Sequence, residues 1–330
     1  MTPTGAACKA CSAMQSLHID VVIPIHGHRA MTEHCLAALA QQTLAHRTIV
    51  VDNASPDDSA PVIRSRFPEV EVVELDTNRG FAAACNAGIA QGSGEVVVLL
   101  NNDVIAPPTF LERLTTPFAA NSHLGSVASV LRHPESLLID SAGLTVDPTL
   151  AGFPRLQGQP EQRATARNPV LLGPAGAAGA YRREALRAVG GLDEQIFFYQ
   201  EDVDLALRLR AAGWSTTLAA DARAEHLGSA TAGRGSPWQR RHGGRARGYL
   251  LRRYGVLHGR HAPRALATET IAAAGDAFFS HDFAALRGRL SGWHDARCDE
   301  RHRPPSDGID SSIGFLASLR LRTRSRAATV

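Results

Sequence analysis

The sequence predicts an α/β fold whose central sheet is mostly parallel and flanked by helices. Over residues 19–100, short apolar runs alternate with segments whose apolar residues recur at helical spacing. Several of these runs end in proline or in Asp and Asn side chains. Strands separated by helical segments of roughly 10 to 15 residues pair in parallel. Their crossover helices then cover both faces of the sheet.

The elements of the first half follow in a regular order. Strands are expected at 19–24, 47–52, 70–75 and 95–100, with helices at 32–42, 60–66 and 80–91. In such sheets, ligands bind outside the carboxyl ends of the strands. The residues at those ends are Pro24, Asp52, Asn53, Asn78, Asn101, Asn102 and Asp103. This edge of the sheet is therefore the expected ligand site.

The second half is less regular. A helix is expected at 110–119 and a strand at 126–131, whereas 147–168 is rich in Pro, Gly and Gln without a period and is expected to be a mobile loop. An amphipathic helix begins at Glu201 and ends before Gly213. A strand over 214–219 follows. From Pro237 the chain is expected to be helical and basic, with no pattern beyond Asp299.

Composition excludes several classes of protein. The chain has 330 residues, of which 44% are hydrophobic, so it is not a wholly disordered protein. No apolar run approaches the roughly 18 residues of a membrane-spanning helix. Residues 1–16 lack the features of a signal peptide, and a cytoplasmic protein is therefore predicted. Five cysteines make an odd number for a disulfide framework, and the pair Cys8 and Cys11 has no second pair to complete a zinc site.

Charge is distributed unevenly along the chain. Residues 233–330 contain 18 arginines and 8 acidic residues, a net charge of +10, and the remainder of the chain is acidic. Between Arg234 and Arg260 there are eight arginines and no acid. This stretch is either a solvated helical face or a surface that contacts an anionic membrane or a phosphorylated acceptor. No nucleic-acid partner is predicted.

Two groups of carboxylates are candidates for chemistry. Asp103 follows a buried strand, where it either holds a divalent cation against a diphosphate or forms a turn. Glu201, Asp202 and Asp204 lie within four residues at a helix start, and they repel one another unless a proton or a positive charge compensates them. His226 lies 24 residues after Asp202, next to a strand. By itself, such a histidine is more often structural than a ligand.

Other chemistries lack their signatures. The chain contains no P-loop sequence, no glycine-rich dinucleotide fingerprint after the first strand, no G-x-S-x-G elbow and no H-E-x-x-H helix. Mononucleotide hydrolysis and nicotinamide binding therefore lose their main support.

Six motifs in order resemble inverting family 2 glycosyltransferases of the GT-A fold, and most closely their rhamnosyltransferase-like branch. The similarity covers about residues 18 to 255. The motifs are the strand ending at Pro24, the segments 49–55, 78–89 and 99–103, Gly190 to Glu194, and Tyr199 to Arg208.

The resemblance implies a role for each matching residue. Asp202 matches the general base, Asp103 the last acid of the metal-binding D-x-D motif, and His226 a histidine that contacts the metal. Asn101 stands where many relatives have Asp, and the prediction of a divalent metal, Mg²⁺ or Mn²⁺, is retained. The acceptor-binding residues implied are Glu201, Asp204 and Trp214. The nucleotide-sugar-binding residues implied are Pro24, Asp52, Asn53, Asn78, Gly80, Phe81, Asn86, Asn101 and Asn102.

The expected organisation is a disordered leader (1–17), a GT-A domain (18–232) and a basic helical extension (233–330) with a disordered end. The domain divides into a nucleotide-sugar half (18–104) and an acceptor half (105–232). The expected reaction moves a sugar, rhamnose from dTDP-rhamnose, to a glycan or lipid-linked glycan, with peripheral attachment at the inner face of the cell membrane. The alternatives are a sugar-phosphate nucleotidyltransferase and an inactive glycan-binding scaffold.

The leading hypothesis depends on one geometric expectation. The carboxyl groups of Asp202 and Asp103 are expected to face each other across a gap that a sugar fills, so that base and metal act on opposite sides of the anomeric carbon.

Overall fold

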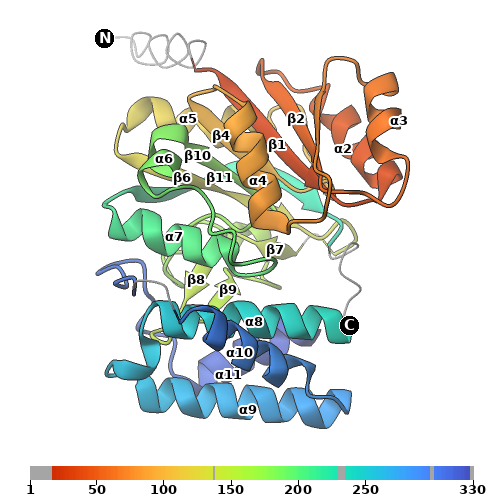
Figure 1. Ribbon diagram of the computed structural model, residues 1–330. Coiled ribbons are helices and arrows are strands. Elements are labelled where there is room, and N and C mark those ends of the chain that lie inside the picture. Colours follow the sequence, from red (N-terminus) through yellow and green to blue (C-terminus); the bar gives the residue numbers. More distant parts are fainter. Residues whose placement is uncertain (1–16, 137, 229–234, 298–300, 328–330) are drawn as a thin grey trace, which may run out of the picture.

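The computed structural model describes residues 17–136, 138–228, 235–297 and 301–327. The leader expected at 1–17, including Cys8 and Cys11, lies almost entirely outside these residues. The centre of the molecule is a mixed sheet in the order β3-β2-β1-β4-β10-β6-β11-β5, with β7 beside β6 (Figure 1). A separate hairpin pairs β8 with β9. The strands are β1 (Ile19–Ile25), β2 (Arg47–Asp52), β3 (Glu71–Glu74), β4 (Val96–Leu100), β5 (Val104–Ile105), β6 (Leu124–Arg132), β7 (Ile139–Ser141), β8 (Leu144–Val146), β9 (Gly152–Pro154), β10 (Ala178–Arg182) and β11 (Ser215–His226).

The first four strands pair in parallel, as the sequence predicts. Alternation along β1 sends Val21 and Ile23 to one face of the sheet and Val22 to the other. The first face is covered by α2 (Arg29–Leu39), α3 (Ser59–Arg66) and α5 (Phe110–Ala120). The second is covered by α4 (Phe81–Gln91), α6 (Arg183–Ala188) and α7 (Glu201–Ala211). Helices on both faces explain why residues 21–23, 49–51 and 96–100 are unbroken apolar runs.

Three expectations for the second half are wrong. Segment 147–168 is not an open loop, because it contains β9, a 3₁₀ turn (Glu161–Arg163) and the buried Asp147 and Arg155. The guanidinium of Arg155 donates to the main-chain carbonyls of Pro169, Ala142 and Ala164, which holds this segment against the body. The last strand continues to His226, well beyond residue 219. Finally, a helix, α11 (Phe315–Ala327), lies in the region expected to have no pattern.

The C-terminal part is helical, as predicted. After α8 (Pro237–Arg253) and a 3₁₀ turn (Val256–His258) come α9 (Ala262–Ser280) and α10 (Ala284–Asp295). Glycines allow α8 and α10 to cross closely, since a Cβ at Gly244 or Gly248 would overlap main-chain atoms of α10. Tyr249 and Leu250 of α8 share a hydrophobic cluster with Val203 of α7, so these helices pack directly on the sheet domain. Within the described residues, no helix has the length and apolarity needed to cross a membrane.

Candidate active site

The first cavity, of about 530 Å³, opens at the carboxyl ends of β1, β2 and β4. It contains seven of the nine residues predicted to bind the nucleotide sugar, together with Asp103. Its lining is Pro24, Ile25, His26, Asn53, Asn78, Gly80, Phe81, Asn101, Asn102, Asp103, Phe197, Phe198 and Trp238. The parallel strands end at one edge, and the cavity lies at that edge as the sequence predicts.

Hydrogen bonds between side chain and main chain shape the cavity wall. The Asn53 amide donates to Asn78 Oδ1 at 3.0 Å and to the Gly80 carbonyl at 3.1 Å, while Asn53 Oδ1 accepts the Arg79 N–H at 2.8 Å. Gly80 has φ +87, and the next residue, Phe81, donates its N–H to the Phe197 carbonyl at 2.9 Å. A Cβ at Gly80 would overlap that carbonyl, so only glycine fits where the two segments meet.

Strand pairing brings Asp103 and His226 together. Val104 pairs with His226 in the antiparallel ladder of β5 and β11, and the Leu227 N–H donates to the Asp103 carbonyl. His226 Nε2 lies 3.3 Å from Asp103 Oδ2, and His226 Nδ1 lies 2.8 Å from an oxygen of Asp140. Asp140 was not predicted from the sequence; it lies on β7, and only the fold places it here.

The two carboxylates determine the charge of this histidine. Burial alone would lower the pKa of His226, but hydrogen bonds and charges from Asp103 and Asp140 raise it to about 10. Burial alone would raise the pKa of Asp140. Hydrogen bonds from His133 and His226 outweigh burial and hold this pKa below its usual range. With no cation bound, the imidazole is therefore positively charged at neutral pH.

The donor atoms near Asp103 fit a divalent cation. Asp103 Oδ1 and Asn101 Oδ1 are buried without a hydrogen-bond partner in the described part of the chain. One carboxylate and one imidazole would leave coordination positions for diphosphate oxygens and water. An Asp140 carboxylate that accepts from Nδ1 is the usual way a metal-binding histidine is oriented. In the described ranges, no group of three or more His, Cys, Asp or Glu side chains is arranged to hold a metal ion. A cation at Asp103 and His226 would therefore need the diphosphate and water as further ligands.

The three acids at the start of α7 have three different environments. Asp204 is fully buried, bonded to Arg208 at 2.7 Å and to the Tyr254 hydroxyl at 2.8 Å. Burial, followed by the charges of Asp202 and Asp204, raises the pKa of Glu201 to about 8. Burial also raises the pKa of Asp202, against hydrogen bonds from the Gly176 and Val203 N–H groups. The repulsion predicted among these three carboxylates is therefore compensated by a proton on Glu201 and by the guanidinium of Arg208, which pairs with Asp204.

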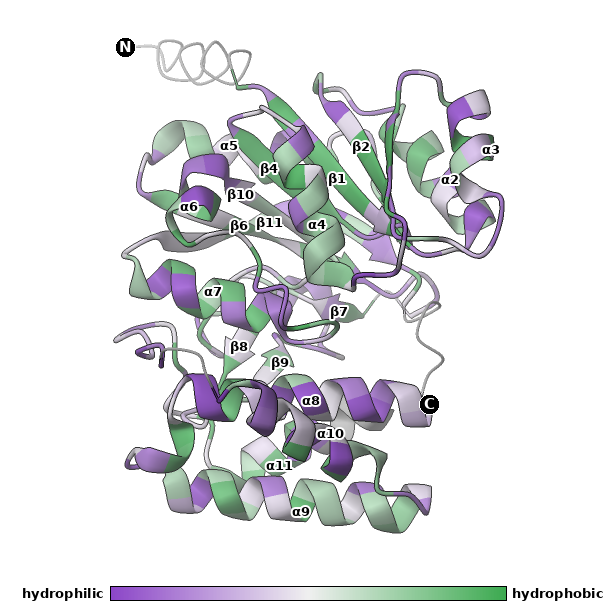
Figure 2. Ribbon diagram, in the orientation of Figure 1, coloured by the Kyte–Doolittle hydropathy of each residue, from purple (hydrophilic) through white to green (hydrophobic). Residues whose placement is uncertain are grey.

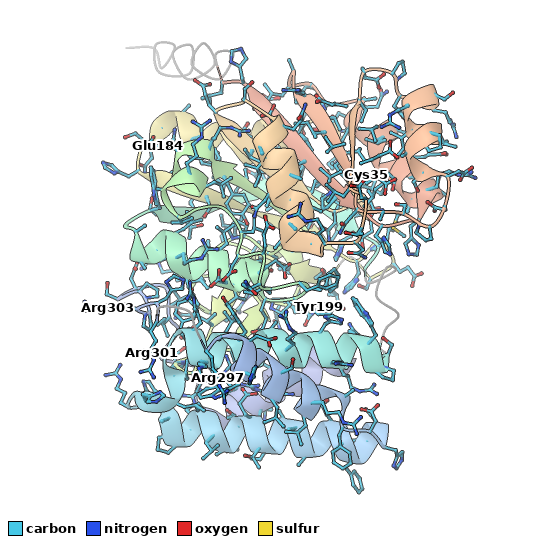
Figure 3. The ribbon with its side chains drawn as sticks, viewed as in Figure 1. Cys35, Glu184, Tyr199, Arg297, Arg301 and Arg303 are labelled. Atoms are coloured by element: carbon cyan, nitrogen blue, oxygen red, sulfur yellow. The ribbon has the colours of Figure 1, made fainter. Side chains whose placement is uncertain are left out.

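Asp202 does not share a cavity with Asp103, contrary to the expectation. It lines a second, neighbouring cavity with residues of α8, α9, α10 and the β8–β9 hairpin. Phe198 and Trp238 line the first cavity, whereas the adjacent residues Tyr199 and Gln239 line the second. Rings therefore form the boundary: Phe198 is 4.4 Å from Tyr199 and 5.6 Å from Trp238, measured between centroids. Figure 3 shows Tyr199 where the sheet domain meets α8.

Main-chain bonds connect the two acids across this boundary. Gly176 donates to Asp202 Oδ2, and the next residue, Ala177, accepts the Asn101 N–H at 2.8 Å. Asp202 is therefore attached to the segment that carries Asp103. Tyr199 and Gln200, just before α7, both have positive φ, a strained conformation that is common at functional sites.

Six predicted site residues do not line either cavity: Asp52, Asn86, Glu201, Asp204, Trp214 and His226, of which the last contacts Asp103. Asp52 accepts the Ser55 N–H at the end of β2. Asn86 bonds to the main chain of Leu192 and to Glu194, so it holds the 191–194 segment. Trp214 precedes β11, at the opposite end of a 12-residue strand from His226, and packs in the core. The Asp204 carboxylate is used by Arg208 and Tyr254. The predicted binding roles of Asn86, Trp214 and Asp204 stay predictions, and the contacts that the structure shows for these three residues are structural.

Glu201 also lines neither cavity. It is buried beneath the site, and its Oε2 has no hydrogen-bond partner within the described ranges.

Sequence reasoning missed the aromatic residues of the site. Phe197, Phe198 and Trp238 belong to a chain of ring contacts that also includes His242 and Phe81. The adjacent aromatic residues 197–199 were the only available signal. Nothing in the sequence indicates that the start of α8 packs on them.

Comparison with known proteins gives a consistent result. The family model described as glycosyl transferase family 2 matches residues 20–190. An N-acetylglucosaminyl-diphospho-decaprenol L-rhamnosyltransferase of Mycobacterium tuberculosis is 28% identical over 225 residues, which cover 61% of this chain and 73% of that protein. The O-antigen biosynthesis protein RfbC of Myxococcus xanthus is 28% identical over 224 residues, 64% of this chain and 17% of that protein.

Solved structures share the fold. A mannosyltransferase from Pyrobaculum calidifontis, in complex with GDP-Man and Mn²⁺, superposes with a TM-score of 0.52 at 16% identity, covering 98% of this chain and 87% of that chain. Residues 1–349 of TarS from S. aureus give a TM-score of 0.55 at 13% identity, covering 85% and 80%. These likenesses confirm the predicted GT-A fold.

Proposed function

The chain belongs to glycosyl transferase family 2, and from this premise we propose that it is an inverting transferase with its donor in the first cavity and its acceptor in the second. The donor is a nucleotide-diphosphate sugar, with dTDP-rhamnose as the leading candidate because of the similarity to the mycobacterial rhamnosyltransferase. The acceptor is a hydroxyl of a glycan or lipid-linked glycan. One observation carries the proposal: seven predicted nucleotide-sugar residues and Asp103 line a single cavity.

Asp202 is proposed as the general base. Each of its oxygens accepts one main-chain N–H and keeps a lone pair for the acceptor hydroxyl. As the acceptor oxygen bonds to the anomeric carbon, the bond to the diphosphate breaks and the hydroxyl proton passes to Asp202. A pKa raised by burial brings this carboxylate closer to the working pH of a base.

Asp103 and His226 are proposed to hold a divalent cation, with Asp140 orienting the imidazole. When bound, such a cation neutralises charge on the leaving diphosphate as a Lewis acid. Asn101 and Asn102 line the same wall and are proposed to contact the diphosphate or ribose. The single sugar-filled gap expected between Asp202 and Asp103 is absent from the described residues, so the proposal requires the substrates to meet where the two cavities adjoin, at the rings of Phe198, Tyr199 and Trp238. Attachment at the inner face of the cell membrane belongs to this proposal, since lipid-linked acceptors lie there.

A donor screen with the purified protein tests the proposal. Nucleotide-diphosphate sugars are offered with and without Mn²⁺ or Mg²⁺, and released nucleotide and glycosylated product are measured. We expect nucleotide release and an inverted glycosidic product with one preferred donor. A nucleotidyltransferase would instead form a nucleotide sugar from a sugar phosphate, and a scaffold would bind no nucleotide. Either result contradicts the proposal.

A further inference from the structure

Helix α9 has an unusual surface. Eight of its residues are exposed and none of them carries a charge: Pro263, Leu266, Ala267, Thr270, Ile271, Ala274, Phe278 and Phe279. Its glutamate, Glu269, is buried against Arg247 and Arg289. Figure 2 shows α9 along the edge of the molecule farthest from β1 to β4. A helix of 19 residues extends this uncharged surface over roughly 28 Å.

The turn after α9 extends the same surface. Phe278 and Phe279 are 73% and 78% exposed, and their rings contact each other. Phe283 in the turn and Leu290 of α10 are exposed as well. We call these exposed apolar side chains the apolar face; they are Leu266, Ile271, Phe278, Phe279, Phe283 and Leu290. Side chains of this size rarely gather on a surface that stays in water.

Positive charge accompanies the apolar face. Arg260 precedes α9, and Arg287 lies one helical turn from Phe283 and Leu290. Both arginines are exposed and neither forms an ion pair with any residue that the structure describes. The nearby acids are occupied, because Asp282 pairs with Arg240 and Asp295 with Arg245. Arg287 also acts electrostatically on Asp282, and Arg260 is hydrogen-bonded to His261. An apolar surface with exposed arginines at its border matches an anionic lipid interface.

The second cavity reaches the apolar face. Phe279 and Ser280 line this cavity together with Asp202. A polar acceptor group could thus reach Asp202 while an attached lipid remains at the face. Three of the eight arginines in the basic stretch 234–260 pair with acids within the protein: Arg240, Arg245 and Arg247.

We propose that the apolar face rests on an anionic lipid surface and presents the second cavity to lipid headgroups. Docking on the lipid surface does not depend on the proposed function. The use of that docking to reach a lipid-linked acceptor rests on the proposed function. A second copy of the chain fits less well, because symmetric pairing would bring the same exposed arginines together.

Vesicle sedimentation of the full chain tests the docking. Vesicles of phosphatidylcholine alone are compared with vesicles that also contain phosphatidylglycerol, over a range of NaCl concentrations. We expect partitioning onto the phosphatidylglycerol vesicles that weakens with salt. The double variant Ile271→Ser, Phe278→Ser should lower the partition coefficient at least about tenfold, and Arg287→Gln roughly fivefold.

The matched control is Leu138→Ser, which removes an exposed leucine on the β6–β7 connection and should leave partitioning unchanged. Circular dichroism verifies that each variant is folded. The docking would be overturned if the double variant partitioned onto vesicles as strongly as the wild type does. It would also be overturned if the wild-type protein did not bind vesicles but formed a dimer, and the double variant were a monomer.

Transfer to a water-soluble acceptor separates the two proposals. If the double variant keeps this activity but loses transfer to acceptor in vesicles, both stand. If vesicle binding depends on the face while no transfer occurs to any acceptor, only the proposed function fails.

Discussion

The two cavities are bounded by different kinds of structure. The first is lined largely by residues at or just after strand ends, fixed by parallel pairing and by the Asn53–Asn78–Gly80 bonds, together with aromatic rings. The second is lined largely by residues of α7 to α11 and of the β8–β9 hairpin. Their side chains are held by ion pairs such as Arg247–Glu269, between residues far apart in the sequence.

Under the proposed function, this difference would separate donor binding from acceptor binding. A cavity built by strand ends keeps its shape when surface helices change. A cavity built by helices would then take another acceptor through substitutions that leave the proposed donor site intact. Asp202 lies on the second side but is bonded to Gly176, next to the segment that carries Asp103. It is therefore a second-cavity residue that is connected through the main chain to the strand end bearing Asn101.

The largest expected effect is that of Asp202→Asn. We expect turnover to fall at least about a hundredfold, because an amide cannot accept the hydroxyl proton. Folding should be unchanged, since Asn can still accept one of the main-chain bonds. Initial rates with saturating donor give the measurement. Asp221→Asn, an exposed position on β11, is the control. Near-normal turnover would remove Asp202 as the base.

Next come the residues proposed to bind the cation. Asp103→Asn should weaken Mn²⁺ binding by roughly a hundredfold and Asp140→Asn by roughly tenfold, because the second acts only through His226. Isothermal titration of Mn²⁺ in the presence of nucleoside diphosphate provides both values. If Asp140→Asn binds Mn²⁺ as the wild type does, the orienting role is wrong.

Substitutions at two glycines separate the cost of backbone strain from the cost of steric overlap. Gly80→Ala combines a positive φ with collision against the Phe197 carbonyl, whereas Gly190→Ala has φ +76 and open space within 4 Å among the described residues. We expect Gly80→Ala to cost about 1 to 3 kcal/mol more free energy of unfolding than Gly190→Ala. Urea titrations measure the difference. Equal costs would show that the 80–197 contact yields easily.

The smallest effect concerns pH. The pKa of Glu201 is raised from 4.5 to about 8 in the folded protein, so between these values the folded state holds a proton that the unfolded state has released. Stability from this group is complete below pH 4.5 and is lost as pH rises toward 8, by at most about 1.4 kcal/mol per pH unit.

Glu201→Gln should remove this loss. The variant should therefore lose less stability than the wild type between pH 5 and pH 8, measured by urea unfolding at each pH. Parallel pH profiles for the two proteins would show that the carboxyl is ionised when folded.

The first cavity was predictable from sequence because local patterns determine it. Apolar runs that end in Asn101 or Asp52 give both the strand and the position of its polar end. The resemblance then identified the residues that line the cavity. The structure shows Asn86 bonded to Leu192 and Glu194 and not in the cavity lining. A motif gives a residue type but not the direction of its side chain.

The second cavity was not predictable, because long-range packing builds it. Trp238 reaches Phe198 only after α8 docks, and Asp140 meets His226 only across the sheet. Trp214 lies far along the chain from the site residue His226 because β11 is longer than its apolar pattern indicates. The separation of Asp202 from Asp103 results from aromatic rings whose tertiary contacts no sequence period encodes.

The separation of roles between the cavities is tested most directly by the dissociation constant of a nucleoside diphosphate, measured with Mn²⁺ for wild type, Asp202→Asn and Asp103→Asn. The account predicts that Asp202→Asn binds the nucleotide as the wild type does while Asp103→Asn loses most of its affinity. Equal loss of nucleotide affinity in both variants would contradict it.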